Sequence, residues 1–167
     1  EAIKNGVSYI FDHHASPNAT NGSLEEIANV IGETNLRASL CFETSDRNGA
    51  KLAFAGIEEN RRFFETQTND NIKSMLGLHA SFTIADDTLA EVEKLLKEYD
   101  LGIHIHLAED PTDAIISKEN TGKLPLSRLL RYNLLNEKSI LAHGIYLTKS
   151  EYKKIDGRGS AIAFNLE

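Results

Sequence analysis

Short apolar runs alternate with longer amphipathic stretches along the whole chain. Short runs of apolar, β-branched or aromatic residues are typical of strands, whereas apolar residues spaced three and four apart are typical of helices. The pattern predicts strands over 7–12, 36–42, 72–79, 102–107, 139–146 and 160–165. It predicts helices after Ser23, over about 50–67, from about Asp86, after Pro111, over about 126–134 and after Thr148.

Local signals mark several helix ends. Ser23 has Glu26 three residues later, the capping-box arrangement that begins a helix. Thr148 precedes a short polar stretch and is predicted to cap a helix there. Residues 1–6 are typical of the last turn of a helix, with Gly6 as its end.

The repeated alternation of strand and helix favours parallel strands joined by right-handed crossovers. No linker or low-complexity tract interrupts it, so we expect 1–167 to form a single domain. Two α/β arrangements agree with this order, a doubly wound sheet and part of a (β/α)8 TIM barrel. In both, functional side chains gather at the C-terminal ends of the strands.

Composition narrows the class of protein. Hydrophobic residues make up 41% of the chain and charged residues 26%, which is ordinary for a globular domain. The net charge of -7 and the absence of any long basic cluster disfavour nucleic acid and anionic membranes as partners. No apolar run approaches the ~20 residues of a membrane span. The single cysteine, Cys41, is typical of a cytoplasmic protein, and its apolar surroundings predict a buried thiol rather than a nucleophile.

The chain has six histidines, and each lies in or directly after a predicted strand. They are His13, His14, His79, His104, His106 and His143. Taken singly, a histidine at a strand end is usually a hydrogen-bonded structural residue. Because parallel strands bring their C-terminal ends together, the joint pattern indicates one functional cluster.

The segment from His104 to Glu109 carries the clearest chemistry. Side chains alternate along a strand, so His104 and His106 share one face while aliphatic residues take the other. Glu109 follows His106 by three residues, just beyond the strand. An imidazole that binds a metal and a carboxylate that moves a proton are the groups that metal-assisted hydrolysis requires.

This segment, His-Ile-His-Leu-Ala-Glu over 104–109, resembles the fifth-strand motif of the amidohydrolase superfamily, in its deaminase and chlorohydrolase branch. Residues 77–83 resemble the fourth-strand phrase of that superfamily, residues 141–144 the sixth, and residues 160–165 the seventh strand. The opening residues 11–17 are most similar to aminohydrolases of the SsnA type. The resemblance covers essentially the whole chain.

The resemblance implies a partial (β/α)8 TIM barrel, about strands 2 to 7, as an internal fragment of a catalytic domain. It also implies that the His-x-His pair of the first strand and the aspartate of the eighth lie outside the chain. His13 and His14 are adjacent and point apart, so they do not replace that pair. We therefore expect the metal site to be incomplete in this chain and the chain alone to be inactive.

The resemblance also assigns roles. His106 would bind one divalent metal, zinc or alternatively iron, and Glu109 would act as the general acid and base. His143 would position the hydrolytic water or bind the metal directly. His79 would hydrogen-bond the substrate, and His14 would lie at the pocket rim. The implied reaction is hydrolysis of a non-peptide C–N bond or a C–Cl bond in a small cyclic substrate.

Other expectations complete the prediction. The alternative function is a non-catalytic, doubly wound α/β module that binds a ligand. Glu43 and Asp46 directly follow the strand predicted over 36–42, which allows them to face the mouth of the site, but the default expectation is a solvated loop. A barrel fragment has unpaired edge strands, so self-association through them is expected. Whether the terminal Leu166 and Glu167 are native stays open from the sequence.

Overall fold

The computed structural model describes residues 1–165, so Leu166 and Glu167 lie outside the described residues. The strands are β1 (Tyr9–His14), β2 (Arg37–Phe42), β3 (Ile72–Ser74), β4 (Leu76–Ala80), β5 (Ile103–Leu107), β6 (Ile140–His143) and β7 (Ala161–Ala163). The α-helices are α1 (Ser23–Gly32), α2 (Ala50–Thr66), α3 (Asp86–Glu98), α4 (Pro111–Thr121), α5 (Pro125–Arg131) and α6 (Lys149–Asp156). Short 3₁₀ turns are η1 (Ile3–Asn5), η2 (Asp46–Asn48) and η3 (Ser81–Thr83).

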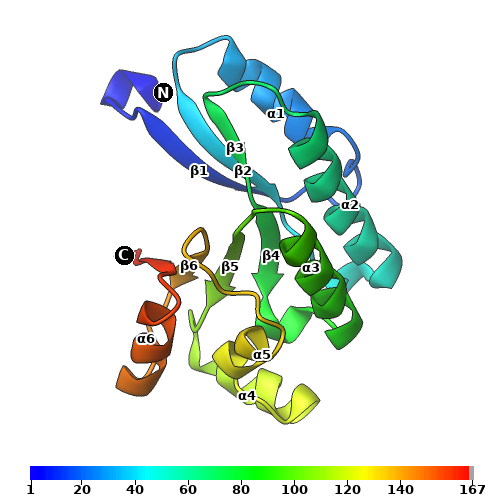
Figure 1. Ribbon diagram of the computed structural model, residues 1–167, viewed down its shortest axis with the longest axis vertical. Helices are drawn as coiled ribbons and strands as arrows, with labels where there is room; N and C mark the ends of the chain where they lie inside the picture. Colours follow the sequence, from blue (N-terminus) through cyan, green and yellow to red (C-terminus); the bar gives the residue numbers. More distant parts are fainter. Residues whose placement is uncertain (166–167) are drawn as a thin grey trace.

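The strands form two parallel sheets, β1-β2-β3 and β4-β5-β6-β7, and within each sheet every strand pairs with the next strand along the chain (Figure 1). The predicted strand over 72–79 is divided into β3 and β4 at Met75. The two sheets are joined there, because the Met75 amide donates to the Leu40 carbonyl and the Thr44 amide donates to the Gly77 carbonyl. A sequential order is that of a singly wound barrel, so the doubly wound alternative is wrong.

Alternation along the strands separates the apolar core from the functional face. Ile103, Ile105 and Leu107 of β5 are buried among residues of α3, α5 and α6. His104 and His106 point to the other face, where both contact the ring of His13. The sequence prediction for β5 is therefore confirmed.

The start of α1 differs from the predicted capping box. Gly22, not Ser23, occupies the cap position, and no side chain of the same segment caps the helix. The amides of Gly22 and Leu24 instead donate to the carboxylate of Glu59 in α2, at 2.9 and 3.0 Å. A carboxylate at the positive end of a helix is stabilising, and here it comes from a distant residue.

Several other predicted helix ends agree with the structure, whereas the helix predicted over about 126–134 already ends at Arg131. Thr148 and Glu151 form a reciprocal capping box at the start of α6, and Pro111 lies in the first turn of α4. Gly6 ends η1 with a φ of 80°. None of the helices in the part of the chain that the structure describes has the length and apolar character needed to cross a membrane.

Asn60 of α2 fixes the place where β2 and β4 meet. Its Oδ1 accepts from the Phe42 amide at 2.8 Å and from the Gly77 amide at 3.4 Å. Its Nδ2 donates to the Phe42 carbonyl at 2.9 Å. Any Cβ at Gly77 would overlap the Phe42 carbonyl, so the close approach of the two strands requires glycine. These contacts set the position of the strand ends that carry the histidines.

Candidate functional site

Five of the histidines meet at the C-terminal ends of β1, β4, β5 and β6. The ring of His13 lies 4.7 Å from that of His104 and 4.6 Å from that of His106, centroid to centroid. The ring of His106 also lies 5.6 Å from His79 and 5.6 Å from His143. We call these five residues the histidine cluster.

His14, predicted at the pocket rim, is not brought to the histidine cluster. Its Nε2 lies 2.8 Å from the Ser16 hydroxyl, and its ring packs edge-on against Phe42. Successive side chains of a strand take opposite faces, so His13 points into the cluster and His14 points towards the helices. Of this adjacent pair, the resemblance gave a role to His14 and none to His13.

His106 is held in an orientation suited to metal binding. Its Nδ1 lies 2.7 Å from the main-chain carbonyl of His79. A carbonyl only accepts, so Nδ1 carries the proton and Nε2 keeps its lone pair. This is the outer-shell hydrogen bond typical of metal-binding histidines. Burial, with the neighbouring His13, lowers the pKa of His106 and favours the neutral ring that a metal requires.

A β-bulge in β4 directs the main-chain carbonyl of His79 towards the ring of His106. The register between β4 and β5 shifts around His79, since Leu78 pairs with Ile105 and Ala80 pairs with His106. The His79 ring is fixed as well, because its Nδ1 lies 2.8 Å from the Thr83 hydroxyl. That hydroxyl donates to the Ala80 carbonyl, so it accepts from His79. The Nε2 of neutral His79 is consequently a hydrogen-bond acceptor, and burial lowers the pKa of the ring.

His143 and Glu109 form a pair at the mouth of the site. The Nε2 of His143 lies 3.5 Å from Oε1 of Glu109, whose side chain is 54% exposed. His143 and Ala108 have φ values of 75° and 52°, in the left-handed region that non-glycine residues rarely adopt. Such strained backbone is typical of functional sites. The structure therefore brings together four of the predicted residues: His79, His106, Glu109 and His143.

Glu43 is a site residue that the sequence analysis set aside by default. Its side chain is 13% exposed, so the expectation of a solvated loop is wrong. Oε2 of Glu43 lies 3.6 Å from Nε2 of His13, and each of Glu43, His13 and His106 offers a donor atom within 4.8 Å of the others. Burial raises the pKa of Glu43, but contact with His13 and the charges of His79 and Arg47 outweigh it and lower the pKa. No local sequence signal distinguishes this carboxylate from those of surface loops.

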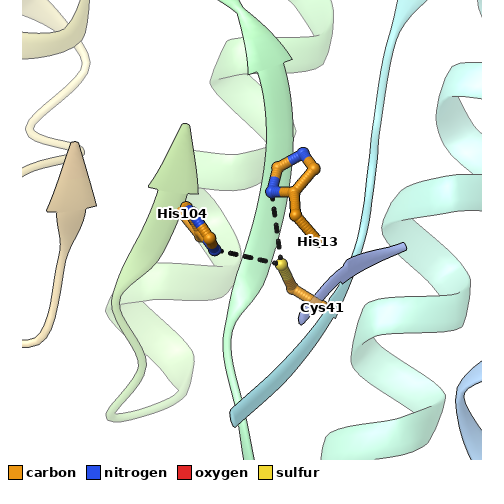
Figure 2. Close-up of side chains that lie close together, drawn as sticks. All are labelled: His13, Cys41 and His104. Atoms are coloured by element: carbon orange, nitrogen blue, oxygen red, sulfur yellow. Dashed lines mark hydrogen bonds between the residues drawn. The ribbon is translucent and has the colours of Figure 1, made fainter. Parts of the chain in front are cut away.

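Cys41 lies below His13 in the barrel interior. It is 1% exposed, which confirms the predicted buried thiol. Its Sγ lies 3.6 Å from Nδ1 of His13 and 3.8 Å from Nδ1 of His104. Dashed lines mark both contacts in Figure 2. Burial raises the pKa of this thiol. Burial, with the neighbouring His13 and His106, lowers the pKa of His104 to about 4.

A cavity of about 480 Å³ adjoins the histidine cluster. Its lining includes His104, His106 and His143 together with aliphatic side chains of β6 and β7, among them Ile140 and Ile162. A hollow with apolar walls and a few imidazoles is typical of small-molecule sites.

Comparison with known proteins identifies the family. The model of the amidohydrolase family matches residues 1–165. The chain belongs to the amidohydrolase family. The predicted resemblance is thereby confirmed.

The relatives within this family include named deaminases. The chain is 34% identical to the 5-methylthioadenosine/S-adenosylhomocysteine deaminase of Pyrococcus abyssi, over 84% of this chain and 34% of that protein. It is 31% identical to the enzyme of that name from Pyrococcus horikoshii, over 98% of this chain and 38% of that protein. It is 30% identical to the 5'-deoxyadenosine deaminase of Methanocaldococcus jannaschii, over 85% of this chain and 35% of that protein. The chain thus spans about a third of the length of these curated relatives.

Solved structures agree on the fold. An adenosine deaminase from Xanthomonas campestris with bound zinc superposes with a TM-score of 0.81 at 22% identity, over 98% of this chain and 36% of that one. The atrazine chlorohydrolase TrzN from Arthrobacter aurescens TC1, complexed with zinc, gives a TM-score of 0.82 at 14% identity, over 99% of this chain and 40% of that one. The predicted fold, part of an amidohydrolase barrel, is confirmed.

Proposed function

We propose that this chain carries part of the active site of a metal-dependent hydrolase that deaminates a small heterocyclic substrate. The observation that carries the proposal is the fixed orientation of His106, whose Nδ1 donates to the His79 carbonyl. Glu109 lies 3.5 Å from His143, whose ring lies 5.6 Å from that of His106. His143 thus links a metal ligand to a proton carrier, and both histidines line the cavity.

The donor set is that of a divalent metal of the zinc class, with iron as the alternative. His106 and His143 would hold it, and Glu43 offers a further donor in reach of His106. Imidazole and carboxylate are ordinary ligands for either ion. When bound, the metal supplies the Lewis acidity that lets water attack near neutral pH.

Glu109 performs the proton transfers. Its exposed carboxylate takes a proton from the attacking water and returns one to the departing amine nitrogen. If His143 does not bind the metal, its Nε2, which faces the same carboxylate, orients that water. His79 offers a fixed acceptor nitrogen, which suits a donor group of the substrate.

The substrate class is an adenosine-type nucleoside. The cavity of about 480 Å³ accommodates a purine between its aliphatic walls and the imidazoles. Relatives of 30% identity or more are named for deamination of adenosine derivatives. The likeness to a chlorohydrolase is one of fold alone, so C–N hydrolysis is favoured over C–Cl hydrolysis.

The test measures ammonia release from adenosine, 5'-deoxyadenosine and 5-methylthioadenosine by the zinc-loaded protein that contains this chain. Glu109→Gln is expected to keep the metal and lower kcat by roughly 10²–10⁴-fold, because an amide cannot carry the proton. Glu119→Gln, on the exposed side of α4, is the matched control and should leave kcat unchanged. Near-parental turnover in Glu109→Gln with full metal content would contradict the role of Glu109.

A further inference from the structure

Three donor atoms meet on the inner face of the barrel, beside the pair assigned to hydrolysis. His13 comes from β1, Cys41 from β2 and His104 from β5, and their donor atoms all lie within 4.8 Å of one another. Figure 2 shows both imidazoles directed at the sulfur. One thiol and two imidazoles form a donor set that prefers thiophilic ions over magnesium or calcium.

The spacing of these atoms matches a metal centre. Zinc binds sulfur at about 2.3 Å and imidazole nitrogen at about 2.0–2.1 Å in tetrahedral geometry, which places sulfur and nitrogen about 3.6 Å apart. The Sγ of Cys41 lies 3.6 Å from Nδ1 of His13 and 3.8 Å from Nδ1 of His104. An ion therefore needs only small side-chain shifts to bind all three.

The surroundings of His13 support ligation through Nδ1. Its other nitrogen, Nε2, is buried and has no hydrogen-bond partner among residues 1–165. The Glu43 carboxylate lies 3.6 Å from that nitrogen, at ion-pair distance. A carboxylate beyond a histidine, with the metal on the other ring nitrogen, is the usual outer-shell arrangement of zinc sites.

The position is enclosed yet reachable. Cys41 is 1% exposed and His104 is 8% exposed. His104 also lines the cavity of about 480 Å³, so one of the three ligands borders open space. Three protein donors and one open position make up the coordination of many zinc centres.

We propose that His13, Cys41 and His104 bind a thiophilic divalent cation of the zinc class, at a site separate from the His106–His143 pair. Cys41 binds as the thiolate, and its proton leaves to solvent. The thiol then gives up its contact with the Asp12 carbonyl, 3.4 Å away. The site ties β1, β2 and β5 together across the inner face.

The experiment titrates the chelator-treated 167-residue chain with cobalt(II). The expected result is a near-ultraviolet thiolate-to-cobalt charge-transfer band that saturates at one equivalent and disappears when zinc is added. Cys41→Ser and Cys41→Ala should abolish the band, and His104→Gln should weaken it. Far-ultraviolet circular dichroism confirms that each variant is folded.

Two controls separate this site from its neighbours. Ser39→Ala changes a buried residue on the same face of β2, two positions from Cys41, and should keep the band. His143→Ala, in the pair assigned to hydrolysis, should also keep it, so this proposal and the proposed function fail independently. Cobalt binding without a thiolate band, or a band that survives Cys41→Ser, overturns the proposal.

A measurement on the unaltered chain does not depend on variant folding. X-ray absorption of the chain with one equivalent of zinc should show one sulfur at about 2.3 Å together with imidazole nitrogen. A zinc environment of nitrogen and oxygen alone overturns the proposal.

Discussion

Replacing Asn60 with leucine should destabilise the fold more than any surface change. The Asn60 side chain makes hydrogen bonds to strand main-chain groups that a neighbouring strand would otherwise make. Asn60 is 1% exposed, and its amide bonds both the N–H and the carbonyl of Phe42 and reaches the Gly77 amide. Leucine has a similar volume but leaves at least the two Phe42 groups without these partners. A buried polar group that loses its partner costs roughly 1–3 kcal/mol, so the expected loss is about 2–6 kcal/mol. That is a large part of the roughly 5–15 kcal/mol that stabilises a typical domain.

The assay is urea unfolding followed by circular dichroism, with the free energy of unfolding extrapolated to water. Asn29→Leu, at an exposed position in α1, is the matched control and should change stability by no more than about 0.5 kcal/mol. A loss below about 1 kcal/mol in Asn60→Leu would refute the reasoning, since it would mean that water or a shifted main chain replaces the amide.

Three further outcomes follow. Gly77→Ala should destabilise the chain in the same urea assay because the new Cβ overlaps the Phe42 carbonyl, whereas Gly32→Ala, whose Cβ meets only the Asn69 side chain, should be tolerated. The hydrogen bond from Arg128 holds the pKa of Asp86 in the folded chain below its usual value. Ionised Asp86 therefore stabilises the fold at pH values above its pKa in the unfolded chain, and this stabilisation is lost as the pH falls through its pKa in the folded chain. The melting temperature should accordingly decrease less steeply with decreasing pH in Asp86→Asn than in the parent. Unpaired edges of β1 and β7 should let the chain self-associate, and light scattering that shows only monomer at high concentration would contradict this.

The histidine cluster was predictable because it depends on topology. Parallel strands place their C-terminal ends at one edge, and period-two alternation places His104 and His106 on the face opposite the aliphatic core. Both rules act within one strand or between neighbouring strands, so they can be applied to the sequence alone. The same locality explains the correct cap at Thr148, whose partner Glu151 is three residues away.

The choice between His13 and His14 was not predictable in this way. Each of two adjacent residues could face inwards, and the sequence around them is mixed on both faces. The pairing of β1 with β2 decides it, because His13 lies beside Cys41 and His14 beside Phe42. A register shift of one residue would exchange the two faces. The Glu59 cap of α1 was missed for a related reason, since its partners lie 35 and 37 residues away along the chain.

The contacts that hold the strands together also place the donors of the site. Phe42 stands between Cys41 and Glu43, and Asn60 anchors its main chain on both the N–H and the carbonyl side. With Phe42 fixed and its ring packed in the core, alternation turns Cys41 towards the barrel interior. Cys41 then meets Nδ1 of His13, and Glu43 meets Nε2 of the same ring. The position of His13 between a thiol and a carboxylate is therefore a consequence of how β2 is anchored to α2. Asn60, a residue that stabilises the fold, thereby also determines the geometry of the ligands at the end of the strand.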